Sequence, residues 1–397
     1  MISKRKKKKT RTVLSLYTGA GGFDLGLEKA GFRIIGAVEA NSDCRKTLEL
    51  NRPKWPVAKK LDIYSYTPKE LAKEFDIVPR QLTVLSAGPP CQPFSKSGYW
   101  FNGDSRRMLD PRAKTLHALL GIVNFVLPEV VLIENVEGIA FVNKDQGLRY
   151  ILRRFKEINK HNKTHYEPQI FKLNAAEYGV PQIRERVFII ASRNGKQFTL
   201  PEPTHHLENA SQTIKDSTEP ALTAWEAIGN IRLGKELTRL KTSGSWTPLL
   251  PSIPEGKNYL WHTEKGGGKN IFKWRSRYWS FLLKLSKNKP SWTIQASPGS
   301  ATGPFHWDNR KLSTRELATL QTFPNEFQFI GSYTSSMKQI GNAVPSAIGE
   351  LFGLAIRKHI LKERVAISLS LIPQRRMRIP SPGKTKPVPA HYKRLQT

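Results

Sequence analysis

A cysteine stands among prolines directly after an apolar run, in Gly-Pro-Pro-Cys-Gln-Pro-Phe-Ser at 88–95. The run at 82–87 is typical of a short buried strand, and Gly88-Pro89-Pro90 ends it at once. We therefore expect Cys91 on a stiff loop at the carboxyl end of a strand, where ligands bind in open α/β sheets. A thiol there is a candidate nucleophile. The alternative is a small apolar residue that only packs.

Three acidic residues lie at the ends of predicted strands in the same way. Glu39 ends an apolar run at 34–38, Asp62 lies in a short run at 60–63, and Glu134 follows the buried run at 130–133. Because the carboxyl ends of parallel strands meet at one edge of a sheet, we expect these carboxylates near Cys91. Capping of a turn or of a following segment is the alternative for Asp62 and Glu134.

A glycine-rich turn follows the first predicted strand, at 13–17, and leads into a helix that starts near Phe23. Gly19-Ala20-Gly21-Gly22 lets the backbone approach a ligand, and the start of the helix faces that ligand. Glu39 lies 20 residues after Gly19, about the spacing at which an acid accepts hydrogen bonds from ribose hydroxyls. The pattern predicts a nucleoside-bearing cofactor, with a tight packing turn as the alternative.

Two arginines alternate in Gln-Ile-Arg-Glu-Arg at 182–186, which runs into the apolar stretch 187–190. In a strand, alternation places Gln182, Arg184 and Arg186 on one face. We therefore predict that Arg184 and Arg186 converge on a site for an anion. A solvated start of a strand is the alternative.

Strands and helices alternate up to residue 192, with helices expected at 43–50, from 68, at 113–125 and near 148–158. This alternation predicts an α/β fold with a doubly wound, mostly parallel sheet covered on both faces. Beyond 192 the chain becomes rich in proline, glycine and tryptophan. The stretch 273–279 interleaves cations with aromatic residues, which suits contact with phosphates and stacking on bases or sugars, although a folded satellite core with basic rims is as good an interpretation.

The last third of the chain contains two predicted helices. One covers 314–322, and a loop is expected at 339–345. Apolar residues at i, i+3, i+4, i+7 and i+8 from Ile348 predict a helix that packs on the first domain. The predicted organisation is a basic arm (1–10), a catalytic domain (11–196), a smaller irregular domain (197–333), a returning helical segment (334–365) and a disordered, basic, proline-rich tail (366–397).

Composition narrows the class of protein. The 397 residues include 64 Lys and Arg against 32 Asp and Glu, a formal charge of +32, which implies a polyanionic partner such as nucleic acid. The two cysteines, Cys44 and Cys91, exclude a disulfide framework or a Cys-rich zinc site and favour a reducing, cytoplasmic compartment. His205-His206 has no suitably spaced partner, so we expect no metal site and assign it to a linker. No apolar run reaches membrane-spanning length.

Taken together, these stretches resemble the DNA (cytosine-5)-methyltransferases, specifically the short bacterial type paired with restriction systems. The resemblance runs from residue 13 to about 359. It rests on six motifs in the family's order: residues 17–23, 88–95, 134–136, 182–186, Arg310 with 312–316, and 339–342. Ser15 and Tyr17 stand where the family often has aspartate and phenylalanine.

The resemblance implies a Rossmann-like catalytic domain, a target-recognition region within 197–333, and a covalent mechanism. Cys91 would add as a thiolate to C6 of a cytosine turned out of double-stranded DNA. Glu134 would hold N3 and the exocyclic amine, and Arg186 the carbonyl. Arg184 would hold the Cys91 loop or a phosphate, while Gln92 and residues 96–107 would close over the base.

The resemblance also implies S-adenosyl-L-methionine as the methyl donor. Its expected binding residues are Tyr17, Gly19, Gly21, Gly22, Phe23, Glu39, Asp62, Ile63, Gly88, Pro89, Asn342 and Ala343. We expect a monomer whose functional partner is a cognate restriction endonuclease. Two alternatives stay open: a cytosine-5 methyltransferase that acts on RNA, and an inert DNA-binding protein of the same fold.

Overall fold

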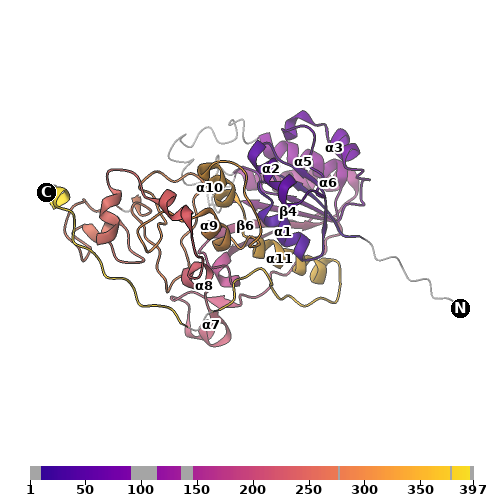
Figure 1. Cartoon of the computed structure of the whole chain (residues 1–397). Helices are drawn as coiled ribbons and strands as arrows, with labels where there is room; N and C mark the ends of the chain where they lie inside the picture. The colour runs from indigo at the N-terminus through magenta and orange to yellow at the C-terminus, as the bar shows by residue number, and fades with distance from the viewer. Residues whose placement is uncertain (1–9, 91–113, 136–145, 276–277, 376–377, 394–397) are drawn as a thin grey trace. The chain divides into compact units, whose positions relative to one another are not determined.

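The computed structural model describes residues 10–90, 114–135, 146–275, 278–375 and 378–393 (Figure 1). The chain forms two compact units. Unit 1 comprises 1–173, 185–202 and 346–369, and unit 2 comprises 174–184, 203–345 and 370–397. Both units are therefore discontinuous in sequence. Among the described residues, no helix combines the length and apolar character that crossing a membrane requires.

Unit 1 is built on a six-stranded sheet with the strand order β2-β1-β3-β4-β6-β5. β1 pairs in parallel with β2 and β3, and β3 with β4, whereas β6 runs antiparallel to β4. The predicted α/β fold with a mostly parallel sheet is thus confirmed. The strands are β1 (Thr12–Leu16), β2 (Arg33–Val38), β3 (Val84–Ala87), β4 (Val130–Asn135), β5 (Gln169–Asn174) and β6 (Glu185–Ser192).

Helices pack around this sheet and bury its central strands. β3 is buried at every residue, and β4 is buried except for Glu134, which keeps a small exposed fraction. This fits the short apolar runs that predicted both strands. The helix from Pro68 begins with the capping box of Thr67 and Glu70. The helical elements are α1 (Gly22–Lys29), α2 (Ser42–Asn51), η1 (Ile63–Ser65), α3 (Pro68–Glu74), α5 (Lys114–Val126), α6 (Gln146–Asn162), α11 (Ser346–Ala355) and η10 (Ile356–Ile360).

The helix predicted from Ile348 returns to unit 1, as expected, and packs on α1. The two helices approach so closely that glycine is required at the contact. A Cβ on Gly26 would lie 2.0 Å from the Ser346 carbonyl oxygen, and one on Gly349 would lie 2.1 Å from that of Phe23. The close contact fixes the start of α1, which follows the glycine-rich turn.

Unit 2 has little regular structure, as its composition predicts. Its core gathers side chains from short 3₁₀ helices and from irregular segments, including Leu249, Tyr259, Leu282 and Phe305. The regular elements are η5 (Ala175–Tyr178), β7 (His205–His206), α7 (Gln212–Ser217), β8 (Glu219–Pro220), α8 (Ala224–Ile228), η6 (Lys235–Leu240), η7 (Thr247–Ser252), η8 (Tyr259–His262), α9 (Thr314–Leu320), α10 (Tyr333–Asn342) and α12 (Ala390–Lys393).

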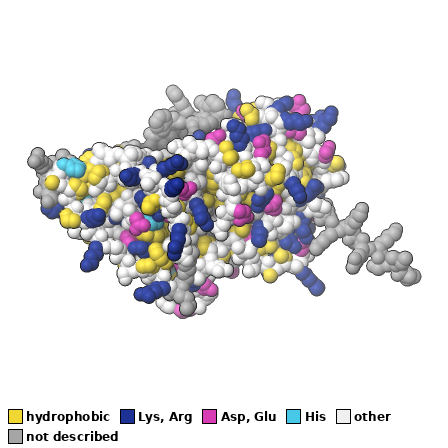
Figure 2. All heavy atoms as spheres, viewed as in Figure 1, with side chains coloured by type: hydrophobic (Ala, Val, Ile, Leu, Met, Phe, Trp, Pro, Cys, Tyr) yellow, Lys and Arg dark blue, Asp and Glu magenta, His cyan; other side chains and the backbone are white. Residues whose placement is uncertain are grey.

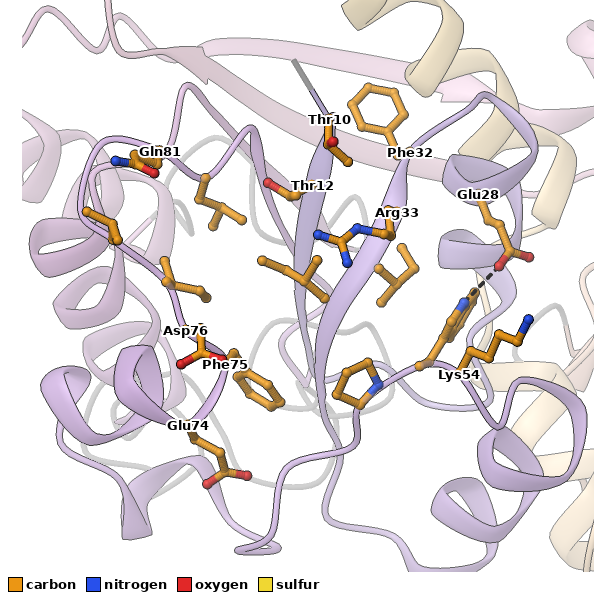
Figure 3. A pocket seen from close by; sticks show the side chains of 17 residues that line it. Thr10, Thr12, Glu28, Phe32, Arg33, Lys54, Glu74, Phe75, Asp76 and Gln81 are labelled. Carbon is orange, nitrogen blue, oxygen red and sulfur yellow. Dashed lines mark hydrogen bonds between the residues drawn. The ribbon is translucent and has the colours of Figure 1, made fainter. Parts of the chain in front are cut away.

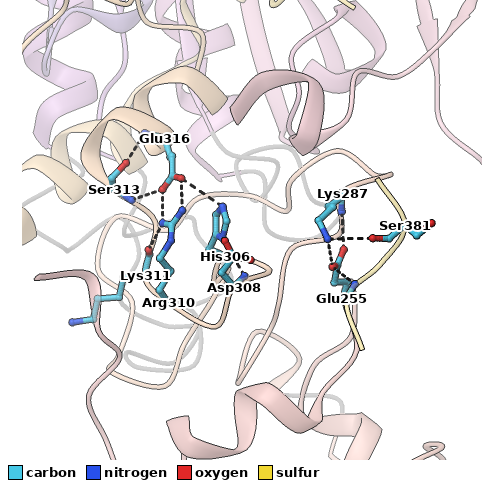
Figure 4. Close-up of polar contacts among 10 residues, drawn as sticks. Glu255, Lys287, His306, Asp308, Arg310, Lys311, Ser313, Glu316 and Ser381 are labelled. Carbon is cyan, nitrogen blue, oxygen red and sulfur yellow. Dashed lines mark hydrogen bonds and ion pairs between the residues drawn. The ribbon is translucent and has the colours of Figure 1, made fainter. Parts of the chain in front are cut away.

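The prediction of a disordered tail was wrong for the described residues after 369. Val388 and Tyr392 are buried in the core of unit 2, and the Tyr392 ring stacks on Trp246 at 5.7 Å between centroids. Lys287 pairs with Glu255 at 2.6 Å and reaches the Ser381 carbonyl (Figure 4). Composition missed this segment because its few apolar residues are spaced among prolines and cations, and Val388 and Tyr392 enter a core formed mostly by earlier residues.

Three further local predictions were wrong. The expected strand at 60–63 is an irregular segment followed by η1. The expected loop at 339–345 begins only after Asn342, because residues 339–342 form the last turn of α10. The histidine pair assigned to a linker forms β7, and burial lowers the pKa of His205.

Candidate functional site

The glycine-rich turn lies at the carboxyl end of β1 and has the backbone geometry that glycine permits. Gly19 and Gly21 have φ angles of 59° and 80°, and Gly21 is the residue that precedes α1. A Cβ on Gly21 would lie 2.8 Å from the Leu48 side chain, so this glycine also serves close packing. Gly22 is buried at the first position of α1. The turn thus brings the start of a helix to one edge of the sheet.

Glu39 is tied to this turn across 20 residues. Its Oε2 accepts a hydrogen bond from the Gly19 N–H at 2.7 Å, and its Oε1 accepts one from the Asn41 N–H at 2.7 Å. The carboxylate is half-buried and stands directly after β2. The structure therefore brings together the two features whose spacing predicted a ribose site.

Other residues predicted to hold the cofactor differ in exposure. Asp62 is exposed and accepts from the Tyr64 N–H at 3.0 Å, which is the capping role considered as its alternative. Ile63 is buried in the core of unit 1. Phe23 stacks on Phe188 of β6 at 6.0 Å.

Tyr17 has a φ of 58° at the end of β1 and donates from its hydroxyl to the Thr115 carbonyl at 2.8 Å. Burial raises the pKa of its phenol, so it acts here as a fixed donor.

Glu134 and Arg186 form an ion pair where β4 and β6 lie side by side. Arg186 Nε is 2.8 Å from Glu134 Oε1, and both side chains are more than four-fifths buried. A Cβ on Gly88 would lie 3.6 Å from Glu134 Oε2, so the pair stands beside the segment that leads into Cys91. The Asn135 amide reaches the Pro89 carbonyl at 3.5 Å. Cys91 and Gln92 themselves lie outside the described residues, as does the loop at 96–107.

The prediction that Arg184 shares a face with Arg186 was wrong, because β6 starts only at Glu185. Arg184 belongs to unit 2 and is 1% exposed. Its Nη2 donates to the Gly341 carbonyl at 2.8 Å and its Nη1 to that of Ile294 at 3.4 Å. Arg184 therefore holds the end of α10, whereas Arg186 pairs with a carboxylate in unit 1.

Asn342 and Ala343, the two predicted cofactor residues of unit 2, lie at the end of α10. Asn342 is exposed, and Ala343 is the C-cap residue. The buried Gln321 donates through Nε2 to the Ile340 carbonyl at 2.7 Å and to that of Ala343 at 3.2 Å. Two buried side chains, Arg184 and Gln321, thus fix this turn. Arg184 belongs to the motif at 182–186 and Gln321 to the helix expected at 314–322, but no local pattern indicated that they hold this turn.

The motif of Arg310 and residues 312–316 forms a compact polar cluster in unit 2 (Figure 4). Arg310 makes two hydrogen bonds to Glu316, at 2.8 and 2.7 Å, while Glu316 and Ser313 form the capping box of α9. His306 Nε2 lies 3.5 Å from Glu316. These contacts give the motif a structural role at the start of α9.

A residue pair that the sequence reasoning missed lies under the glycine-rich turn. Ser15 Oγ donates to Asp24 Oδ2 at 2.9 Å, and Asp24 is 2% exposed. Asp24 Oδ1 is also buried and has no hydrogen-bond partner among the described residues. Burial raises the pKa of Asp24 to about 7. The sequence contains a signal for this pair. Ser15 stands where the resembling family often has an aspartate, and Asp24 supplies an acid in the first turn of the following helix.

A cavity of about 870 Å³ opens elsewhere in unit 1 (Figure 3). Its lining includes Thr12 and Arg33, at the amino ends of β1 and β2, together with Trp55 and Phe75. None of the predicted site residues lines it. The cavity therefore belongs to the edge of the sheet opposite the one where the glycine-rich turn, Glu39 and Glu134 lie.

Comparison with known proteins identifies the family to which the chain belongs. The model of the C-5 cytosine-specific DNA methylases matches residues 11–358. The type II methyltransferase M.SacI of Streptomyces achromogenes is 35% identical over 373 residues, which cover 88% of this chain and 93% of that protein. M.NgoFVII of Neisseria gonorrhoeae, also a type II methyltransferase, is 32% identical over 342 residues, 84% of this chain and 83% of its own.

A solved structure shares the fold at lower identity. The Entamoeba histolytica methyltransferase EhMeth superposes with a TM-score of 0.60 at 15% identity, covering 90% of this chain and 100% of its own. The predicted resemblance is confirmed by these matches. The chain belongs to the C-5 cytosine-specific DNA methylases and is a DNA (cytosine-5)-methyltransferase of the type II restriction-modification kind.

Proposed function

We propose that this protein methylates C5 of a cytosine that is turned out of double-stranded DNA, through a covalent bond between Cys91 and C6. The observation that carries the proposal is the Glu134–Arg186 pair, which stands at the end of β4 beside Gly88, three residues before the only cysteine in the loop motif. A carboxyl group and a guanidinium together match the donor and acceptor edge of cytosine.

Cys91 supplies the nucleophile. Its thiolate forms a bond to C6, and the electron pair of the C5–C6 double bond makes C5 nucleophilic. C5 then forms a bond to the methyl carbon of the donor, whose sulfonium sulfur would leave as a neutral thioether with the electron pair of the broken S–CH3 bond. Loss of the C5 proton to a base restores the C5–C6 double bond and breaks the S–C6 bond. The free thiolate returns, so atoms and electrons balance. Stacked bases block access to C6, and methyltransferases are among the enzymes known to extrude their target base.

Glu134 holds the base in this scheme. Its carboxyl group hydrogen-bonds N3 and the exocyclic amine, where charge develops as the thiolate adds. Arg186 keeps the Glu134 carboxyl in place through the 2.8 Å contact and takes the carbonyl oxygen of the base. Holding the base by three edge groups gives selectivity for cytosine over thymine, whose N3 carries a proton and whose C4 carries an oxygen.

The glycine-rich turn and Glu39 fit S-adenosylmethionine. A carboxylate tied to a turn with positive φ angles suits a ribose, and the start of α1 suits a polar head group. When bound, S-adenosylmethionine supplies an electrophilic methyl group on a sulfonium sulfur. We assign its adenosine to Phe23, Glu39, Asp62 and Ile63, with Tyr17, Gly88 and Pro89 around it.

The charge of the chain supports DNA as the substrate. Lys and Arg outnumber Asp and Glu two to one, and Figure 2 shows their side chains spread over the visible face. Phosphate contacts of this kind supply affinity that does not depend on sequence. We further propose that the enzyme acts as a monomer and protects host DNA from a cognate endonuclease.

The test uses a substrate that traps the covalent step. Bisulfite sequencing of DNA from cells that express the protein first maps the methylated site. A duplex with 5-fluorocytosine at that position then blocks the last step, because fluorine cannot leave as a cation. With S-adenosylmethionine present, we expect an adduct that survives denaturation and maps to the peptide containing Cys91.

Cys44 provides the matched control. It is buried on α2, so Cys44→Ala removes a thiol without touching the proposed site. Cys44→Ala should form the adduct, whereas Cys91→Ala should bind DNA and form none. Glu134→Gln should lower the rate of methyl transfer by roughly 10²- to 10³-fold. An adduct with Cys91→Ala would disprove the assignment of the nucleophile, and adducts on RNA alone would favour the RNA alternative.

A further inference from the structure

The cavity of about 870 Å³ in unit 1 has no part in the proposed function (Figure 3). Sites for small molecules in proteins commonly have volumes of about 300 to 1,000 Å³ and apolar walls that carry a few polar groups. The cavity has this composition, because Ile34, Ile77 and Leu82 line it and each is at most 7% exposed. Its size and its lining are therefore those of a ligand site.

Two aromatic side chains, Trp55 and Phe75, line the cavity, and the surrounding structure holds both in place. A Cβ on Gly21 would lie 3.1 Å from the Trp55 ring, and Trp55 Nε1 donates to Glu28 Oε1 at 2.8 Å. A Cβ on Gly36 of β2 would lie 2.7 Å from the Phe75 ring. Because both rings are already fixed, a ligand that packs on them loses little affinity to the ordering of side chains.

Arg33, the first residue of β2, brings a guanidinium to this apolar surrounding (Figure 3). Its side chain is exposed, and among the described residues its guanidinium has no hydrogen-bond or ion-pair partner. A guanidinium carries five N–H donors in a planar arrangement that matches the oxygens of an oxyanion. Arg33 is therefore suited to bind the anionic group of a ligand.

The carboxylates that line the cavity do not occupy Arg33. Glu28 and Glu74 each accept two hydrogen bonds, at 2.6 to 2.8 Å, from other groups of the protein. The remaining charged side chains of the lining, Asp76 and Lys54, are exposed and opposite in sign. Arg33 thus remains available for an anion that enters the cavity.

We propose that this cavity, which we call the Arg33 cavity, binds a small organic anion with an apolar ring system. The anionic group binds Arg33, and the rings pack against Trp55 and Phe75. The proposed function uses the opposite edge of the sheet, so this inference does not depend on it and is tested separately.

The test uses anilinonaphthalene sulfonate, which joins an apolar ring system to one sulfonate and fluoresces when it leaves water. Titration into the full-length protein gives the affinity, with saturating S-adenosylmethionine present to keep the probe from the cofactor edge. Arg33→Gln should bind this probe roughly tenfold more weakly, because the hydrogen bonds to a charged partner are lost. Phenylnaphthylamine, which has the same rings without the sulfonate, should bind Arg33→Gln and the unchanged protein equally.

Arg232→Gln is the matched control, because Arg232 is an exposed arginine of unit 2. It should bind the sulfonate probe as the unchanged protein does. Val78 lines the cavity and is 52% exposed, so Val78→Glu adds a negative charge there without disturbing the core. Val78→Glu should weaken binding of the sulfonate probe, whereas the neutral Val78→Gln should not.

Three results would overturn the proposal. Arg33→Gln could keep full affinity for the sulfonate probe, it could lose affinity for both probes equally, or Arg232→Gln could lose as much affinity as Arg33→Gln. The first two would show that Arg33 does not bind the anionic group. The third would show that the probe responds to the charge of the whole protein and not to the Arg33 cavity.

Discussion

The sheet edge of unit 1 and the core of unit 2 are built by different means. In unit 1, strands of one sheet bring Glu39, Gly88 and Glu134 to one edge. Glu39 and Gly88 directly follow β2 and β3, and Glu134 is the second-to-last residue of β4. In unit 2, segments as distant in sequence as residues 246 and 392 meet in one core without a sheet to align them. In unit 1 a regular sheet positions the candidate site, whereas unit 2 is held together by irregular packing.

This difference predicts that the two units respond separately to perturbation. The repeated backbone pairing of unit 1 spreads its stability over many similar contacts. Unit 2 depends on a few large side chains and long-range contacts. Seven of the nine tryptophans lie in unit 2, so tryptophan emission mainly follows that unit.

Removal of residues 370–397 should have the largest effect. It takes Val388 and Tyr392 out of the core of unit 2 and removes the contact between Arg375 and Glu226. Burial of two such side chains is worth about 4 kcal/mol. We expect tryptophan emission to change at much lower urea concentration than in the full chain, while hydrogen exchange in β1, β3 and β4 stays slow. Unchanged exchange in both units would show that the segment only lies on the surface.

Substitution of Arg184 should mainly lower stability, whereas substitution of Arg186 should mainly lower activity. Arg184→Met leaves the Gly341 and Ile294 carbonyls without their donor, so unit 2 should lose about 3 kcal/mol of stability in urea unfolding. Arg186→Met should lower methyl transfer far more than stability, because its partner Glu134 keeps some access to water. If both variants lost activity at unchanged stability, the assignment of Arg184 to the frame of unit 2 would be wrong.

The sequence predicted unit 1 well because its elements are periodic. The strands near 13, 34, 84 and 130 are short apolar runs that end in glycine or an acid, and the structure has all four. The run at 60–63 was too short to distinguish a strand from a turn, and Asp62 caps η1 instead. The loop expected at 339–345 was wrong for 339–342, because Gly341 does not break α10. It serves close packing, since a Cβ added there would lie 2.6 Å from the Ala296 backbone.

The candidate site was predictable only at the carboxyl ends of strands. Glu39 and Glu134 stand at the ends of β2 and β4, as the apolar runs predicted, whereas Arg184 has its partners in unit 2 and Arg186 pairs with Glu134 in unit 1. Alternation assumed that β6 began at 182, and the chain passes from unit 2 to unit 1 between 184 and 185. The partners of Gln321 and Asp24 are set by tertiary contacts, which no local pattern encodes.

Asp24 should give unit 1 a stability that falls as pH rises. Its pKa is raised from 3.8 to about 7, so between these values the folded protein binds a proton that the unfolded chain has released. Stability should therefore decrease from about pH 4 to about pH 7 and then level off. Asp24→Asn removes this dependence and should be on the order of 2 kcal/mol more stable than the unchanged protein at pH 8, with no gain at pH 4. Urea unfolding followed by circular dichroism at both pH values measures it.

Because of Lys284, the stability of unit 2 should rise with pH in the alkaline range. It is 4% exposed, donates to the Ile253 carbonyl, and burial lowers its pKa from 10.5 to about 8. Between pH 8 and 10.5 the unfolded chain holds a proton that the folded protein lacks, so stability should rise with pH in that window. Lys284→Met should stabilise unit 2 at pH 7 by about 1 kcal/mol, because the lost hydrogen bond offsets part of the relieved burial of charge. That advantage should disappear by pH 10.5, measured by tryptophan emission in urea. If Lys284→Met still stabilised unit 2 at pH 10.5, the difference in stability between the two proteins would arise from packing and not from charge.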